Sequence, residues 1–263
     1  MVPEKLFDFP IVQPVLVTAD ATIDPSLTGE SIVNLWGMTK METTNYQSGL
    51  SLQPNPIAIA IIDTGIDRNH KDLSKNTWIN TKEIAGNKID DDGNGYVDDV
   101  NGYDFINGDA DPMDDHGHGT HVSGSAAGVV NRGGVFGVNS SAKVLGLKVL
   151  SAAGNGSSYD VYRAVYYAAN NGIKVINLSL GGAGNPSNDP ICNAIDYAKS
   201  KGTITVVAAG NSNVNVSNQV PAGCTNAITV GAVGSNLAKA SFSNYGSKVD
   251  VAAPGVSVYS SLP

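Results

Sequence analysis

Three of the chain's four histidines lie within one short stretch, DDHGHGTHVSG at residues 114–124. An imidazole changes charge near neutral pH and can also bind a metal, so this stretch could transfer protons or hold an ion. His116, His118 and His121 lack the H-E-x-x-H pattern of a zinc helix, which makes a zinc site the weaker interpretation. The small residues that follow predict a helix starting at His118 and packed closely on a sheet, with His116 and His121 as structural residues.

A carboxylate that could orient one of these imidazoles stands at the end of an apolar segment. Asp63 directly follows IAIAII at residues 57–62, which predicts a buried strand. A buried carboxylate is costly unless it has a partner. The backbone N–H groups of its own turn, Thr64-Gly65, are one possible partner. The other is His118, and an aspartate–imidazole pair of this kind can take a proton from a hydroxyl group.

The elements that would position these residues alternate between strands and helices. Near-continuous apolar strands separated by helices predict an α/β fold, a mostly parallel sheet with helices on both faces. In such sheets the chemistry gathers beyond the carboxyl ends of the strands, where Asp63 and Asn211 both stand. Further strands are expected at 142–150, 174–180, 203–209 and 227–233, and helices are expected to begin near 158 and 190 and to end at Gly172 and Gly202.

Acidic residues are concentrated in one part of the chain, whose formal charge is −8. Residues 90–115 hold ten of the 24 acidic residues and no lysine or arginine. The acidity is therefore local, it argues against nucleic acid as a partner, and it repels itself unless a cation neutralises it.

Part of this acidic region, DDDGNGYVDDVN at residues 90–101, has the spacing of an EF-hand calcium loop, with Gly95 at the sharp turn. The twelfth position is Asn101 in place of the usual glutamate, so Asp99 is expected to act as a substitute ligand. A solvated acidic turn without an ion is the alternative. The expected calcium ligands are Asp90, Asp92, Asn94, Tyr96 through its carbonyl, Asp98 and Asp99.

Four motifs occur in an order that resembles the subtilisin-like serine peptidases, or subtilases: DTG at 63–65, HGTHVSG at 118–124, SLGG at 179–182 and AAGN at 208–211. The resemblance covers about residues 55–263 and implies a three-layer, subtilisin-like α/β fold. It also implies catalytic roles for Asp63, His118 and Asn211, as orienting carboxylate, general base and oxyanion donor. This triad order and this asparagine are those of subtilisin itself, the type case of the mechanism.

The resemblance further implies how a peptide or protein substrate would bind. An extended peptide would add as a strand between Ser179-Leu180-Gly181 on one side and Gly156 on the other. Ala208 and Gly210 would form a wall of the pocket for the side chain before the scissile bond.

The nucleophile of the family lies in a GTS motif, and none occurs in the 263 residues. We therefore expect an N-terminal arm at 1–30 and an incomplete peptidase domain at 31–263, whose C-terminal part is missing or is supplied as a separate segment. The alternatives are a catalytically inactive relative that only binds peptides, and a calcium-dependent structural module.

Two further features follow from the resemblance. The first is a second calcium site with ligands from Asp72, Val129, Asn131, Gly133 and Val135. The second concerns Cys192 and Cys224: the residues alone allow free thiols or a disulfide, and the resemblance favours the disulfide. That bond would fit a secreted protein. No run of residues is long and apolar enough to cross a bilayer.

Overall fold

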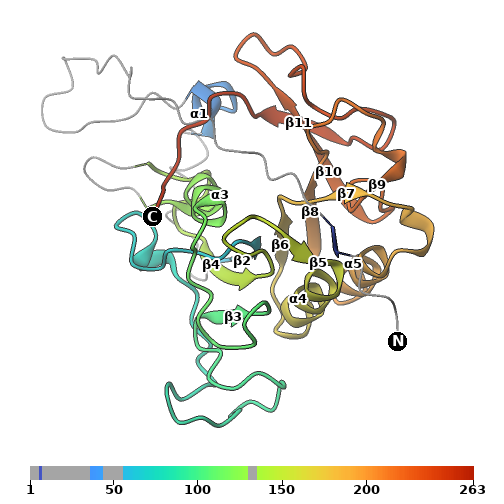
Figure 1. Ribbon diagram of the computed structural model, residues 1–263. Helices are drawn as coiled ribbons and strands as arrows, with labels where there is room; N and C mark the ends of the chain where they lie inside the picture. The colour runs from blue at the N-terminus through green and yellow to red at the C-terminus, as the bar shows by residue number, and fades with distance from the viewer. Residues whose placement is uncertain (1–5, 8–35, 44–55, 130–134) are drawn as a thin grey trace, which may run out of the picture.

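The computed structural model describes residues 6–7, 36–43, 56–129 and 135–263. Its main feature is a seven-stranded, fully parallel sheet in the order β11-β10-β8-β6-β2-β4-β3 (Figure 1). The strands are β2 (Ala58–Asp63), β3 (Gly102–Asp104), β4 (Lys143–Lys148), β6 (Val175–Leu178), β8 (Ile204–Ala208), β10 (Ala227–Val233) and β11 (Val251–Pro254).

Helices cover both faces of the sheet, which confirms the predicted three-layer α/β fold. Helices α4 (Ser158–Asn170) and α5 (Pro190–Ser200) lie together on one side, and α3 (His118–Ala127) lies on the other (Figure 1). Successive strand residues point to opposite faces. Ile62 accordingly packs with the α4 and α5 side, while Ile61 packs with Ala127 of α3.

The signals that predicted α4 and α5 act as expected. The Asp189 carboxylate accepts the N–H of Ile191 at 2.9 Å and caps α5, and Pro190 occupies its first position. Beyond the helix ends, Gly172 and Gly202 adopt φ of +72° and +80°, the left-handed conformation that glycine takes without strain.

Several short elements were not predicted. Besides β3 and β11, they are β7 (Gly182–Ala183), β9 (Gln219–Val220), the helix α1 (Trp36–Lys40) and the 3₁₀ helices η1 (Ser74–Asn76), η2 (Pro186–Asn188) and η3 (Val216–Asn218). Strand β5 (Gly156–Ser157) contains Gly156, where the resemblance implied a strand beside the substrate. Strand β1 (Leu6–Phe7) pairs antiparallel with β5, and β7 pairs antiparallel with β9. The rest of the expected arm at 1–30 lies outside the described residues.

A disulfide joins Cys192 at the start of α5 to Cys224, just before β10, with 1.94 Å between the sulfur atoms. This is the pairing that the resemblance implied. Within the ranges that the structure describes, no helix has the length and apolar character needed to span a membrane.

Candidate active site

Asp63 and His118 meet where β2 ends and α3 begins. Oδ1 of Asp63 lies 2.7 Å from Nδ1 of His118, and the side chains are 0% and 5% exposed. Close packing of α3 on β2 makes this contact possible. A Cβ atom on Gly119 would lie 2.0 Å from the carbonyl oxygen of Gly65, so glycine is required for this approach.

The surroundings of the pair favour the charged imidazole. Burial alone would lower the pKa of His118, but the negative charge of Asp63 and the hydrogen bond to it outweigh burial, and the pKa is raised. Because Nδ1 faces the carboxylate, Nε2 is the ring nitrogen that remains for proton transfer. The backbone N–H of Thr64 donates to the same oxygen of Asp63 at 2.7 Å.

A second buried carboxylate, Asp114, fixes the loop that leads into α3. Its Oδ1 accepts from the Thr64 hydroxyl at 2.8 Å and from the N–H groups of His116 and Gly117 at 3.0 and 2.9 Å. Its Oδ2 accepts from the N–H and hydroxyl of Thr120 at 2.9 and 2.6 Å. Asp114 thus ties the residues before and after His118 to the residue that follows Asp63.

We expect Asp114→Asn to lower the free energy of unfolding at neutral pH by about 2–3 kcal/mol, because the amide must face N–H donors with its own NH₂ group. Burial opposes ionisation of Asp114, but the hydrogen bonds from Thr120, Gly117 and His116 lower its pKa overall. The stabilisation is therefore present above the unfolded pKa of about 3.9 and is lost as the pH falls through the lower folded value.

Urea titrations of both proteins from pH 7 to pH 3 measure this effect. Asp111→Asn is the control, since Asp111 pairs with Arg68 on the surface, with 63% of its side chain exposed, and should change stability by less than about 1 kcal/mol. Equal effects of the two substitutions at pH 7 would contradict the role given to Asp114.

A buried lysine holds the same region from the neighbouring strand. The Lys148 side chain, at the end of β4, is 2% exposed. Its Nζ donates to the carbonyl oxygens of Thr64 and Leu150 at 2.7 and 2.8 Å and to the Asp115 carboxylate at 2.6 Å. Lys148 therefore links the ends of β2 and β4 beside the Asp63–His118 pair.

The other predicted catalytic and substrate-binding residues, apart from Gly156, lie at the carboxyl ends of β6 and β8, at the same edge of the sheet. They line a pocket of about 300 Å³ between the two strand ends, which brings together Ser179, Leu180, Gly181, Ala208, Gly210 and Asn211. Gly156 lies elsewhere, in β5, where it pairs with Phe7.

The loop that carries Asn211 is fixed by Asn244, which is 2% exposed. Its Nδ2 donates to the Ala209 carbonyl at 2.8 Å, and its Oδ1 accepts the N–H groups of Ser212 and Val214 at 2.9 and 3.0 Å. These bonds fix the backbone on both sides of Asn211 in the sequence. The sequence analysis did not identify Asn244, since a single asparagine in a loop gives no signal of such a role.

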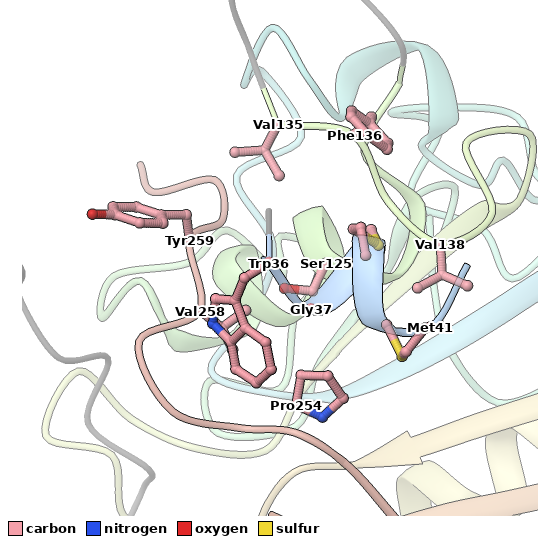
Figure 2. A pocket seen from close by; sticks show the side chains of 11 residues that line it. Trp36, Gly37, Met41, Ser125, Val135, Phe136, Val138, Pro254, Val258 and Tyr259 are labelled. Carbon is pink, nitrogen blue, oxygen red and sulfur yellow. The ribbon is translucent and has the colours of Figure 1, made fainter. Parts of the chain in front are cut away.

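A larger cleft of about 510 Å³ lies on the α3 side of the sheet. Ser179 and Asn211 line it from the strand ends and His121 lines it from α3, while half-buried Val206 and Val230 form part of its floor. Next to it is a smaller apolar pocket of about 100 Å³ (Figure 2), which shares with the cleft the lining residues Met41, Ser125, Val138 and Pro254.

The other two histidines of the opening stretch make contacts with the backbone. Nδ1 of His116 accepts the N–H of His118 at 3.3 Å, and Nε2 of His121 lies 3.2 Å from the carbonyl oxygen of Val258. These contacts agree with structural roles for His116 and His121.

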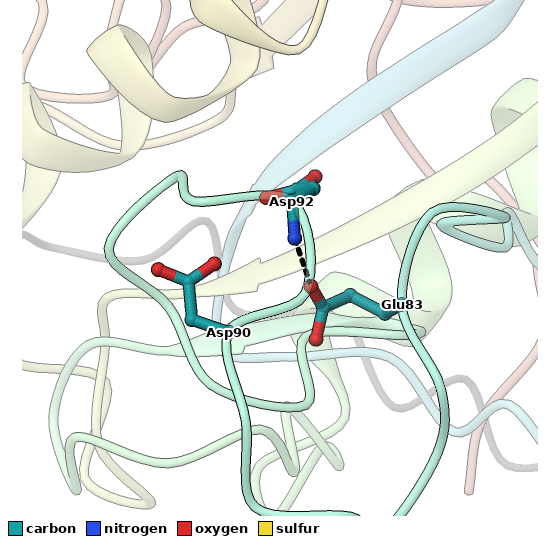
Figure 3. A group of neighbouring side chains, drawn as sticks. All are labelled: Glu83, Asp90 and Asp92. Carbon is teal, nitrogen blue, oxygen red and sulfur yellow. Dashed lines mark hydrogen bonds between the residues drawn. The ribbon is translucent and has the colours of Figure 1, made fainter.

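In the acidic loop, the predicted calcium ligands divide into two groups. Asp90 and Asp92 lie close together, and Glu83, which the sequence analysis did not identify, joins them: one carboxylate oxygen from each lies within 4.8 Å of the others (Figure 3). Asp98 and Asp99 are outside this group. The last two predicted ligands are Asn94 and Tyr96, and the side-chain oxygen of Asn94 accepts the N–H of Tyr96 at 2.8 Å.

The second predicted calcium site is described in part. Oδ2 of Asp72, which is 2% exposed, accepts the N–H of Val135 at 3.0 Å, and the Asp72 carbonyl accepts the N–H of Val129 at 2.8 Å. Asn131 and Gly133 lie outside the described residues.

Comparison with known proteins gives consistent results. Residues 55–262 match the model of the subtilase family, Peptidase_S8. Thermitase of Thermoactinomyces vulgaris is 41% identical over 206 residues, which are 78% of this chain and 65% of thermitase. A thermophilic serine proteinase of Bacillus sp. (strain AK1) is 40% identical over 83% of this chain and 49% of its own length. Among solved structures, a cold adapted subtilisin-like serine proteinase superposes with a TM-score of 0.63 at 34% identity, covering 78% of this chain and 65% of its own. The chain thus spans about half to two thirds of the length of these relatives.

Proposed function

Since the chain belongs to the subtilase family, we propose that it forms part of a serine endopeptidase that hydrolyses peptide bonds in extended polypeptides. The observation that carries this proposal is the buried 2.7 Å contact between Asp63 and His118 at the end of a central strand. A protein that only bound peptides would need no such pair.

In the proposed mechanism, Nε2 of His118 accepts the proton of a serine hydroxyl as that oxygen attacks the peptide carbonyl. His118 then donates this proton to the leaving amine. Asp63 keeps the imidazole in the required tautomer and stabilises its charged form. Asn211 supplies the side-chain amide that donates to the oxyanion, an interaction that gains strength only as negative charge develops.

We place the serine on a segment beyond these 263 residues, seated in the 510 Å³ cleft. Ser179 and Asn211 border this cleft, and its floor is partly apolar, as a packed helix would require. The 263 residues alone would then retain only slight catalysis over water.

The proposed substrate is an extended peptide that adds as a strand beside Gly156 and beside Ser179-Leu180-Gly181. The pairing of β1 with β5 supports this mode, because a strand of the chain itself already lies antiparallel beside Gly156. Among the residues that the structure describes, none that lines the 300 Å³ pocket is charged, so we expect this pocket to take an uncharged side chain.

We also propose that calcium stabilises the protein at the acidic loop and near Asp72, and that the protein is secreted. Buried or clustered carboxylates occur at both places, and the disulfide fits an oxidising compartment.

Labelling with a fluorophosphonate, which reacts with activated serines, tests the peptidase proposal. We expect the natural protein to be labelled on a serine outside residues 1–263, and residues 1–263 alone to stay unlabelled. His118→Ala should abolish labelling, whereas Asp111→Asn should leave its rate unchanged. A natural protein that binds peptides but is neither labelled nor hydrolytic would instead be a peptide-binding relative.

A further inference from the structure

Glu83 approaches the acidic loop from a segment that lies outside it in the sequence. Its side chain extends toward the turn that carries Asp90 and Asp92 (Figure 3). One oxygen from each of the three carboxylates lies within 4.8 Å of the other two. Like charges this close repel each other unless a cation lies between them.

The two oxygens of Glu83 differ in their surroundings. Oε1 accepts the backbone N–H of Asp92 at 3.0 Å. Glu83 is only 8% exposed, and its Oε2 is buried without a hydrogen-bond partner among the described residues. A buried carboxylate oxygen without a donor is strongly unfavourable, and a bound cation removes that penalty.

The two other predicted carboxylate ligands of the loop, Asp98 and Asp99, are engaged elsewhere. The Asp98 carboxylate accepts the N–H groups of Asn87 and Lys88 at 3.1 and 3.0 Å. Asp99 is fully buried, and its carboxylate accepts from the Asn80 and Asn94 side-chain amides at 3.0 and 2.8 Å and from the Tyr167 hydroxyl. Asp99 therefore links the loop to α4.

Asp90 and Asp92 are in turn fixed by the loop backbone. Asp90 accepts the N–H groups of Asn94 and Gly95 at 3.0 and 2.8 Å, and Asp92 accepts that of Asn94 at 3.1 Å. These bonds orient the two carboxylates without using all of their lone pairs.

We infer that Glu83, together with Asp90 and Asp92, forms the calcium site of the acidic loop, and that Glu83 replaces the carboxylate missing at the twelfth loop position. This inference rests on the calcium binding proposed above and assigns its ligands. Calcium takes oxygen ligands at about 2.3–2.6 Å, so any two ligands of one ion lie within roughly 5 Å of each other, a condition that these three oxygens meet.

Calcium titration of the purified natural protein, followed by calorimetry, tests the ligand assignment. We expect Glu83→Gln to weaken the affinity of one calcium ion at least about tenfold and to leave the others unchanged. Asp98→Asn is the matched control, because it removes one charge from the same loop and asparagine tolerates the φ of +56° at that position. It should change the affinity less than about twofold.

Thermal unfolding separates ligand loss from misfolding. In excess chelator, Glu83→Gln should unfold at the same temperature as the unsubstituted protein or at a slightly higher one. The reason is that the substitution relieves the repulsion of Glu83 by Asp90 and Asp92. When calcium is added, only the unsubstituted protein and Asp98→Asn should show the full increase in unfolding temperature. Loss of the ion in Asp98→Asn but not in Glu83→Gln would overturn the assignment while leaving calcium binding intact. Absence of calcium binding near this loop in every variant would instead refute the proposed calcium site itself.

Discussion

Asp63→Asn should lower kcat for peptide hydrolysis by about 10⁴-fold in the serine-containing protein, with the fold intact. The substitution preserves shape but removes the charge that stabilises the imidazolium, and the amide no longer selects the required tautomer of His118. Losses of this size are those known for the triad aspartates of subtilisin and chymotrypsin-like enzymes. Steady-state kinetics with a chromogenic peptide would measure it, and Asp111→Asn should remain within about twofold of the unsubstituted rate.

The pH profile adds a readout that structural damage would not imitate. General-base catalysis needs neutral His118, so activity rises as the pH passes upward through its pKa. Because the charge of Asp63 contributes to the raised pKa of His118, the residual activity of Asp63→Asn should rise at lower pH than that of the unsubstituted enzyme. A kcat within about tenfold of the original, or an unshifted profile, would show that the pair has no catalytic role.

Removal of the disulfide should have the largest effect on stability. We expect Cys192→Ala/Cys224→Ala to lower the free energy of unfolding by about 3–4 kcal/mol, because the bond closes a loop of 32 residues in the unfolded chain. That loop contains β8, the Asn211 turn and β9, so the wall of the 300 Å³ pocket that faces Ser179-Leu180-Gly181 belongs to it.

Urea unfolding of the oxidised protein, the reduced protein and the double variant would measure this loss in the free energy of unfolding. The reduced protein and the double variant should unfold at similar urea concentrations, both below the oxidised protein. Limited proteolysis should also cleave the double variant first between residues 192 and 224. A double variant as stable as the oxidised protein would mean that the bond constrains little or does not form.

Most of the central sheet could be predicted because its strands are runs of mainly apolar residues, as in β2, β4 and β10. The ends of α4 and α5 were equally clear, since Asp189, Gly172 and Gly202 act through local backbone geometry. Strand β3 gave no signal because Gly102, Tyr103 and Asp104 combine a glycine at φ +108° with a buried acid, neither typical of strands.

The Asp63–His118 contact was predictable because each residue stands at the end of an element that the sequence defines. The residues that support it were not. Asp114 and Lys148 each bond to Thr64, which lies 50 and 84 residues away in the sequence, and these contacts exist only once the chain has folded. Asn244, which fixes the Asn211 loop, likewise acts on residues 30 to 32 positions away. Glu83 was missed for a related reason: the calcium-loop pattern was read only within residues 90–101, whereas its third carboxylate comes from before that loop.

The strand order has a consequence for synthesis on the ribosome. Once β4 has entered between β2 and β3, every later strand pairs with one already made: β6 with β2, β8 with β6, β10 with β8 and β11 with β10. A nascent chain can therefore extend one growing edge without rearranging what has folded. The Asp63–His118 pair can therefore form while the segment that carries Asn211 is still being translated. The candidate active site is completed only late in synthesis.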